Sequence, residues 1–167
     1  MSINGTEKLD LSSDSIHVST TESEWAKLVG DVSATLPELF ACGIVDLEFG
    51  EWVELRTEGT HPVDFLGYLA MTTQSYFEGD SVRTIQAVLD GTHSPDGGQA
   101  PPGAPPRRKA LPIDELIFRT GRTLHIMVRL AAAPGLVLSV VAPAGSKLGW
   151  ILSNIRSFAA GHGPAAA

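Results

Sequence analysis

The most constraining feature of this sequence is a series of three strand-like runs in its second half, with connections too short to hold a helix. The runs are Ile113 to Thr120, Leu124 to Leu130 and Leu136 to Ala142. Gly121 lies in the first connection and Pro134-Gly135 in the second, and these residue types are typical of tight turns. Strands joined by such short turns run antiparallel. The second half of the chain therefore predicts a three-stranded antiparallel meander.

Alternation along the first two runs assigns their side chains to two faces. We expect one apolar face, made of Leu116, Phe118, Leu124, Ile126, Val128 and Leu130. We expect a mixed opposite face, made of Glu115, Ile117, Arg119, His125, Met127 and Arg129. A sheet with two such faces is covered on one side and at least partly covered on the other.

A shorter pattern of the same period occupies Gly43 to Arg56. Apolar residues alternate with acidic ones there, namely Val45, Leu47 and Phe49 with Asp46 and Glu48. Gly50-Glu51 is then the expected hairpin turn, and Trp52-Val53-Glu54-Leu55 is the returning strand. The two acidic residues would share one face, where alternating charge on a half-exposed strand explains them better than acid–base catalysis does.

Helical periodicity begins before this hairpin. Thr21-Glu22-Ser23-Glu24 has the form of a capping box, and an apolar stripe with helical spacing starts at Trp25. Pro37 would clash with the carbonyl group four residues before it, so we expect a kink or a restart near Thr35.

Two further helices are predicted, one before the meander and one after it. Val63 to Leu89 carries an apolar stripe, and Gly79 is expected to be a weak point within one continuous helix. The last helix is expected from about Gly145 to Ala160, with Gly161 as its end.

The remaining segments are polar or rich in proline and glycine. Residues 1–20 are expected to be a mobile lead-in, residues 91–112 a Pro/Gly-rich loop or tether, and residues 161–167 a disordered tail. The chain of 167 residues is then a single domain over residues 21–160. Its predicted class is α+β, a five-stranded antiparallel sheet with helices on its faces in the order α-β-β-α-β-β-β-α.

Composition restricts the classes of partner and compartment. The formal net charge is −7, with 12 basic and 19 acidic residues, which argues against nucleic acid because phosphate contacts need basic side chains. The single cysteine, Cys42, cannot form an internal disulfide. No uninterrupted apolar run approaches the ~18 residues of a membrane span. We therefore expect a cytoplasmic protein without a membrane span.

The sequence lacks the motifs of catalysis and of cofactor binding. The five histidines are scattered, with neither His-x-x-x-His nor Cys-x-x-Cys spacing, so no metal site is predicted. Cys42 has apolar neighbours and is expected to be a buried, inert thiol. Gly145-Ser146-Lys147 is like the end of a phosphate-binding loop, but Val140 stands where that motif requires its first glycine. We expect neither an enzyme nor a cofactor.

The element order and the closing segment GLVLSVVAPAGSKLG, residues 135–149, resemble the Roadblock/LC7 family. In bacterial members a last strand runs into a turn of small residues and a helix that opens with Leu-Gly or Val-Gly. Ile113 to Leu130 is similar to the central hairpin of that family, and Val63 to Leu89 is similar to its long middle helix. The likeness covers about Trp25 to Phe158 apart from the Pro/Gly-rich loop. That loop is longer than in the family, and Phe49-Gly50-Glu51 replaces the usual Asp-Gly turn of the first hairpin.

The resemblance implies a homodimer, or a heterodimer with a paralogue, that is a non-catalytic regulator or scaffold of a small Ras-like GTPase in a motility or polarity complex. The third strands of two sheets would pair across a two-fold axis, and the middle helices would lie side by side. We accordingly expect the dimer interface at Phe65, Leu69, Tyr76, Glu115, Ile117 and Arg119. Partner contacts are expected at Trp150, beside the apolar stripe of the last helix, and in the basic run at Arg107 and Arg108.

Two other function classes stay open at this point. A secretion chaperone that wraps an unfolded client segment would place three strands before the long helix, where this sequence predicts two. A small-ligand sensor domain would enclose a pocket with polar groups, for which His125 and Arg129 are the candidates.

Overall fold

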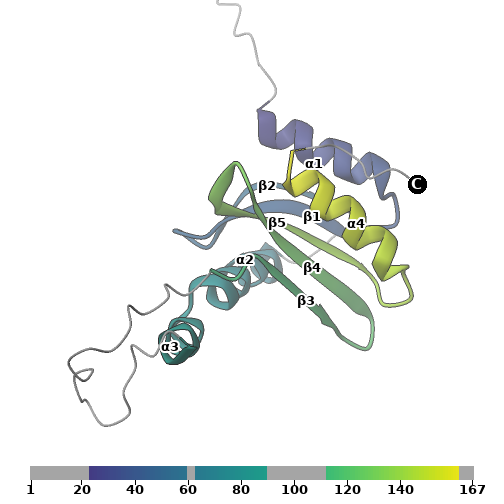
Figure 1. The fold of residues 1–167 in the computed structure, drawn as a ribbon. Helices are drawn as coiled ribbons and strands as arrows, with labels where there is room; N and C mark the ends of the chain where they lie inside the picture. Colours follow the sequence, from purple (N-terminus) through teal and green to yellow (C-terminus); the bar gives the residue numbers. More distant parts are fainter. Residues whose placement is uncertain (1–22, 60–62, 90–111, 162–167) are drawn as a thin grey trace, which may run out of the picture.

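The computed structural model describes residues 23–59, 63–89 and 112–161 and shows a five-stranded sheet between two layers of helices (Figure 1). The strands lie in the order β2-β1-β5-β4-β3, and each pairs antiparallel with its neighbours. Their bounds are β1 Ala41–Asp46, β2 Glu51–Thr57, β3 Glu115–Arg119, β4 Thr123–Leu130 and β5 Ala133–Pro143. The helices are α1 Glu24–Thr35, α2 Val63–Glu78, α3 Asp80–Leu89 and α4 Leu148–Ala159. The predicted α+β class and antiparallel sheet are confirmed.

Several predictions concern segments that lie outside the described residues. These are the lead-in at residues 1–20, the Pro/Gly-rich loop except Pro112, and the tail beyond Gly161. Over the described ranges, no helix combines the length and the apolar character that crossing a bilayer requires.

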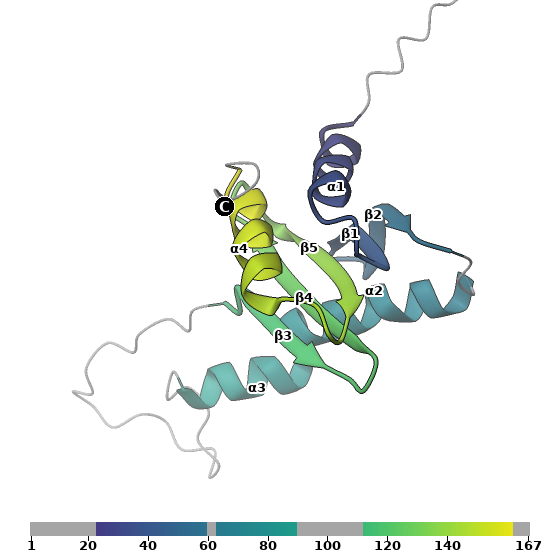
Figure 2. The ribbon, with the colours of Figure 1, turned by 90° about the vertical axis from the view of Figure 1, so that its right-hand side faces the viewer.

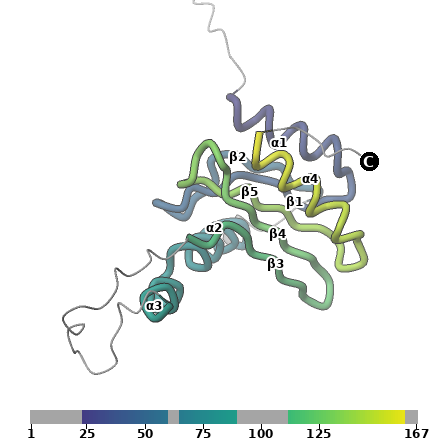
Figure 3. The backbone as a smooth tube through the Cα atoms, viewed as in Figure 1, coloured from purple at the N-terminus to yellow at the C-terminus, as the bar shows by residue number. Residues whose placement is uncertain are grey.

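The helices divide between the two faces of the sheet. α1 and α4 cover one face and contact each other, whereas α2 lies against the other face (Figure 2). α2 is held there by two side chains: Trp52 donates its indole N–H to the carbonyl of Leu66 at 2.7 Å, and Gln74 donates to the carbonyls of Leu47 and Glu48 at 3.1 and 3.0 Å. α3 continues beyond the end of α2 and leaves the body of the domain (Figure 3).

The larger hydrophobic core lies between the sheet and the pair α1/α4. It contains Val29, Val32 and Leu36 from the first helical segment, alternate residues of β1, β4 and β5, and Ile151, Ile155 and Phe158 from α4. The opposite face has two smaller buried clusters, which contain Leu47, Phe77, Met127 and Val137, and Ala41, Leu69 and Val141. The burial on both faces explains why β4 and β5 consist largely of consecutive apolar residues.

The N-terminal helix starts and ends close to the predicted points. Its N-cap is Ser23 and not Thr21, and the Ser23 hydroxyl accepts a hydrogen bond from the Ala26 N–H at 3.1 Å. The expected capping box does not form around Ser23, because Ala26 has no side chain that could bond back to the cap. The helix ends at Thr35, as Pro37 predicts.

The turn between β1 and β2 occupies residues 47–50 and not Gly50-Glu51 as predicted. Asp46 fixes this turn, because its carboxylate accepts hydrogen bonds from the backbone N–H groups of Glu48 at 2.7 Å and Phe49 at 3.3 Å. Gly50 closes it at a φ of 69°, which favours glycine. Asp46 therefore stabilises a turn, and because Glu48 lies within that turn the two residues do not share one face of a strand as predicted.

The predicted faces of β3 are wrong. Leu116 pairs with Met127, and Phe118 pairs with His125, so the two apolar residues of β3 lie on the α2 face and not with Leu124. The reason is the length of the connection, which has four residues between the paired Arg119 and Leu124. Paired residues lie on the same face of the sheet, so an even number of connecting residues places the even-numbered side chains of β3 with the odd-numbered side chains of β4.

The predicted middle helix is two helices, α2 and α3, separated by Gly79. Helical hydrogen bonds flank the break, from Gly79 N–H to Ser75 and from Arg83 N–H to Gly79, each at 3.0 Å. A side chain at Gly79 would collide with the carbonyl of Ser75, so the bend depends on glycine. The prediction of one continuous helix with a weak point at Gly79 is therefore wrong, and the chain bends there between two helices.

We expect Gly43→Ala to destabilise the fold through a steric clash. A Cβ at this position would lie 2.5 Å from the carbonyl oxygen of Glu54 and 2.8 Å from the Trp52 ring. The resulting overpacking should lower the free energy of unfolding by about 1–3 kcal/mol, measured by urea denaturation. Gly67→Ala is the matched control, because nothing lies within 4 Å of its Cβ position on α2. It should leave stability equal or raise it by about 1 kcal/mol, and equal losses in both variants would contradict the prediction.

Candidate interaction surface

β3 forms one edge of the sheet, and half of its backbone polar groups face away from β4. The carbonyl of Asp114 accepts a hydrogen bond from the N–H of Arg129 at 2.8 Å, and the pairing of β3 with β4 is regular from there. In antiparallel strands, residues that bond to the partner strand alternate with residues whose N–H and C=O point outward. The outward positions are therefore Glu115, Ile117 and Arg119, and they form an open hydrogen-bonding edge.

The side chains of these three residues lie on the face that carries α4. Glu115 accepts two hydrogen bonds from the Arg156 guanidinium, at 2.6 and 2.7 Å, and this pairing raises the pKa of Arg156. Arg119 donates to the carbonyl of Ala144. Ile117 is 36% exposed. Contacts with α4 and with the turn between β5 and α4 thus hold the edge strand in an extended form.

An aromatic cluster joins the other face of this edge to α2. The ring of Phe118 stacks on His125 with a centroid distance of 4.3 Å and an interplanar angle of 10°. Tyr76 of α2 contacts Phe118 edge-on at 5.8 Å and 69°. α2 and the free edge therefore form one continuous surface.

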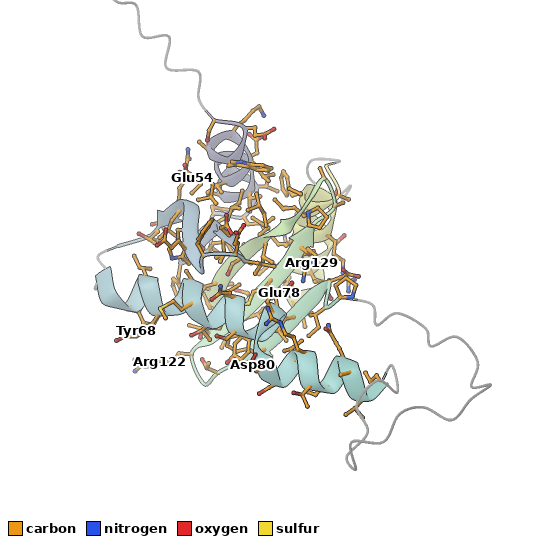
Figure 4. The ribbon with its side chains drawn as sticks, turned by 90° about the vertical axis from the view of Figure 1, so that its left-hand side faces the viewer. Glu54, Tyr68, Glu78, Asp80, Arg122 and Arg129 are labelled. Atoms are coloured by element: carbon orange, nitrogen blue, oxygen red, sulfur yellow. The ribbon has the colours of Figure 1, made fainter. Side chains whose placement is uncertain are left out.

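The outer sides of α2 and α3 expose large apolar side chains. Between 42% and 80% of each of these side chains is accessible: Phe65, Tyr68, Met71, Tyr76, Ile85, Val88 and Leu89. Tyr68 projects outward from α2 in Figure 4. Such a concentration on two consecutive helices exceeds the scattered apolar residues of an ordinary surface and is typical of an interaction site.

Comparison with solved structures identifies this architecture. The chain is similar to a Roadblock/LC7 domain from Streptomyces avermitilis, with a TM-score of 0.54 and 13% identity over 82% of this chain and 92% of that one. The chain has the Roadblock/LC7 fold. A structure of MglB with tetrameric arrangement is similar at a TM-score of 0.54 and 15% identity, over 83% of this chain and 86% of the other. The gliding protein MglB from Thermus thermophilus is similar at a TM-score of 0.54 and 13% identity, over 83% of this chain and 87% of the other.

Comparisons of the sequence itself give no match. Neither a known family pattern nor a curated protein matches this chain. At 13–15% identity the structural likeness shows that the folds are alike and says nothing of the roles of individual side chains.

The predicted interface residues of α2 differ in their accessibility. Phe65 is 51% exposed and Tyr76 is 42% exposed, whereas Leu69 is only 8% exposed and packs against Ala41 and Val141 of the sheet. Leu69 therefore supports the position of α2 within the Roadblock/LC7 fold, and its neighbours on the outer side present the surface.

Of the predicted partner-binding residues, the structure describes Trp150 alone. Trp150 is 40% exposed on α4, on the opposite side of the sheet from α2. Arg107 and Arg108 lie outside the described residues.

Arg129 and His125, the candidate pocket residues, have separate surroundings. Arg129 is largely buried and forms an ion pair with Glu78 of α2 at 3.0 Å (Figure 4). His125 lines a cavity beside α2, whose lining does not include Arg129.

Three exposed apolar residues near this surface, Phe40, Tyr68 and Met71, were not predicted from the sequence. The spacing of Phe65, Tyr68 and Met71 by three residues could have indicated one helix face. This spacing was hard to recognise because α2 is apolar on both its inner and its outer side. Periodicity alone does not tell the buried side of such a helix from the exposed side.

Within the part of the chain that the structure describes, no three His, Cys, Asp or Glu residues are grouped so that they could hold a metal ion. Cys42 is 1% exposed, and burial raises the pKa of its thiol to about 12. A thiol in this state is protonated and unreactive at neutral pH.

We expect Cys42 to resist thiol reagents in the folded protein. Ellman's reagent at pH 8 should react at least ~100-fold more slowly with the native chain than with the chain in guanidinium chloride, because only the unfolded state offers thiolate. The raised pKa also stabilises the fold below the pKa of the unfolded thiol, and this contribution is lost as the pH rises from about 9 towards about 12. Cys42→Ser should weaken that alkaline decline, and equally rapid labelling of native and unfolded chains would show that the site opens readily.

Proposed function

We propose that this chain is a non-catalytic regulator or scaffold that acts as a dimer and binds a small Ras-like GTPase. The observation that carries the proposal is the open edge of β3 beside the exposed apolar residues of α2 and α3. The Roadblock/LC7 fold supports it, since structurally similar proteins are described as a gliding protein and as an MglB with tetrameric arrangement.

The dimer would form by pairing of two β3 strands around a two-fold axis. Two antiparallel copies of the same edge satisfy each other's outward N–H and C=O groups at Glu115, Ile117 and Arg119. Such pairing extends the sheet across both chains and protects an edge that could otherwise aggregate. α2 of each protomer, with Phe65 and Tyr76, would flank the axis on one face of the joined sheet. A paralogue with the same edge could replace the second copy.

A regulator of this kind would act on the conformation of its partner. A protein can change the hydrolysis rate of a GTPase by binding one arrangement of the switch loops more tightly than another, without supplying a reacting group. We assign the partner contact to the face of α4, where Trp150 is 40% exposed, together with Arg107 and Arg108. A large, partly exposed aromatic residue is a typical anchor of a protein interface.

The chaperone alternative receives no support from the strand order. Within residues 23–59, two strands precede α2, whereas a secretion chaperone of that class would have three strands before its long helix. The ligand-sensor alternative concerns a different part of the molecule, the cavity lined by His125.

The proposal is tested by isolating the tagged chain from its own cells with GDP or with a non-hydrolysable GTP analogue, followed by mass spectrometry. We expect a small GTPase in one nucleotide state and its reduction by at least ~10-fold with Trp150→Ala, the loss of an interface anchor. Ser153→Ala, on the exposed side of the same helix, is the matched control. Recovery of no GTPase in either state, with the chain intact, would overturn the proposal.

A further inference from the structure

α3 exposes a stripe of apolar side chains. Ile85, Val88 and Leu89 are each more than half exposed, and no residue of this helix is buried. Their spacing of three and four residues places these side chains on one side of α3. A helix of ten residues gains most of its stability from the packing of such a face, so this side of α3 is suited to contact another surface.

A groove of similar character lies between α2, the start of β1 and the tip of the β3–β4 hairpin, with a volume of about 390 Å³. Phe40, Phe65 and Tyr68 line it with exposed aromatic rings, and Leu69 and Val141 form its buried part. None of its described lining residues is an Asp, Glu, Lys or Arg. The groove therefore suits the apolar side of a helix.

α2 carries α3 away from this groove and past the free edge of the sheet. Near the start of α2, the carbonyl of Leu66 accepts from Trp52 of β2, and near its end Phe77 packs beside Phe118 of β3. α3 follows and lies beyond the β3 side of the sheet (Figure 2). The apolar stripe of α3 is therefore on the side where a second copy would pair through β3.

The end of α2 and the groove lie toward opposite ends of β3. The groove lies at the hairpin tip and along the row of paired residues that crosses the sheet from Phe118 to Ala41. The end of α2 lies toward the start of β3, because Glu78 pairs with Arg129, whose backbone N–H bonds to the carbonyl of Asp114. α3 thus leaves the domain near the start of β3, and the groove lies near its end.

The outward groups of β3 select one register for the proposed pairing. An axis at Ile117 places this residue opposite its own copy and Glu115 opposite Arg119 of the partner subunit, so that all three outward positions of each strand are bonded. An axis at Leu116 or Phe118 would leave one outward position of each strand beyond the end of the other. The axis at Ile117 also places opposite charges across from each other.

This two-fold axis reverses the direction of the partner, so that the start of one β3 lies beside the end of the other. α3 of one protomer is thereby brought to the hairpin tip of the second, where the groove lies. We propose that each α3 docks its stripe of Ile85, Val88 and Leu89 in the groove of the other protomer. The inference rests on the proposed dimer and adds to it a reciprocal contact between α3 and the hairpin tip.

The docking supplies the contact area that strand pairing lacks. β3 has five residues, whereas stable interfaces have about 20–30 residues a side and bury about 1,200–2,000 Å². The stripe and the groove are present twice in a dimer, and their exposed apolar side chains would be buried together with the edge. A dimer of useful stability therefore needs this second contact as well as the strand ladder.

Ile85→Glu tests the docking without disturbing a single chain, because Ile85 is exposed there. A carboxylate placed in an uncharged apolar groove is unfavourable. We expect the dissociation constant of the dimer, measured by sedimentation equilibrium, to rise at least ~10-fold. Arg83→Gln is the matched control, since it changes the net charge equally at an exposed site about 160° around the same helix. It should leave the dissociation constant within about 2-fold of the wild type.

The outcomes separate the docking from the dimer on which it rests. A wild type that is monomeric at tens of micromolar would overturn both. A wild type that dimerises with the same dissociation constant as Ile85→Glu would overturn the docking alone and leave the pairing of β3 intact. Equal weakening by Ile85→Glu and Arg83→Gln would also overturn it, because the effect would then be one of charge and not of the stripe.

Cross-linking between chains tests the location of α3 directly. A Val88→Cys chain is mixed with a Tyr68→Cys chain, left to exchange subunits and treated with a short bismaleimide, while the native Cys42 is buried. We expect a covalent dimer of the two different chains, in at least ~10-fold greater yield than when Val53→Cys on β2 replaces Tyr68→Cys, because only close thiols are joined. Equal yields from the two mixtures, or no covalent dimer from the first, would overturn the docking.

Discussion

Replacing Ile117 by proline is expected to convert the proposed dimer into monomers. The N–H of Ile117 faces away from β4, so proline removes a donor that only a second copy would use. Its ring also occupies the space through which another strand would approach. Size-exclusion chromatography with light scattering at tens of micromolar should show the mass of one 17.7 kDa chain, where the wild type shows two.

The matched control for this variant is Thr57→Pro on the opposite edge of the sheet. The N–H of Glu58 bonds to the carbonyl of Phe40 at 2.8 Å, so the neighbouring Thr57 has its N–H directed outward from β2 in the same way. We expect this variant to remain dimeric. Similar circular dichroism spectra of both variants would show that the fold is kept. A wild type that is monomeric at these concentrations, or an Ile117→Pro variant that remains dimeric, would contradict pairing through β3.

The sequence was sufficient to predict the order of elements along the chain, because each strand is marked by its own composition and turns. Pro37 ended α1 at the expected point, and Gly161 terminates the last helical segment with a φ of 79°. The antiparallel pairing of β3, β4 and β5 followed from their short connections alone. Local signals of this kind depend on backbone chemistry and do not require tertiary contacts.

Register and surface could not be predicted in the same way. The faces of β3 depend on the number of residues between Arg119 and Leu124, and this number is fixed by the hydrogen bonds of Thr120 within the turn. The bend at Gly79 depends on the close approach of this residue to the carbonyl of Ser75, which the spacing of apolar residues does not reveal. The cavity at His125 is lined by four separate segments, and no spacing along the chain reveals it.

Among the described charged residues, Arg129 is the one whose replacement should destabilise the fold most. Its guanidinium donates to the carbonyl of Ile113 at 3.0 Å, to the carbonyl of Pro134 and to the carboxylate of Glu78 at 3.0 Å. Its charge also lies 5.3 Å from the centre of the Phe77 ring. The Arg129 side chain is 9% exposed, whereas the side chain of Glu78 is 39% exposed and keeps partial access to water. One residue thus joins the end of α2, the approach to β3 and the start of β5.

Arg129→Met should lower the free energy of unfolding by about 3 kcal/mol, because it leaves two carbonyls and a partly buried carboxylate without their donor. Arg129→Lys should recover little, since an ammonium group cannot reach three acceptors in the fixed geometry of a guanidinium. Arg83→Met is the matched control: this arginine is 66% exposed and lies 3.9 Å from Asp80, and such surface pairs contribute about 0.5 kcal/mol or less. Urea denaturation of the three variants measures these differences. Equal losses for Arg129→Met and Arg83→Met would show that the buried contacts of Arg129 add no more than a surface ion pair. A loss confined to Arg129→Met and Arg129→Lys would show that one side chain stabilises both the end of α2, through Glu78, and the approach to β3, through the carbonyl of Ile113.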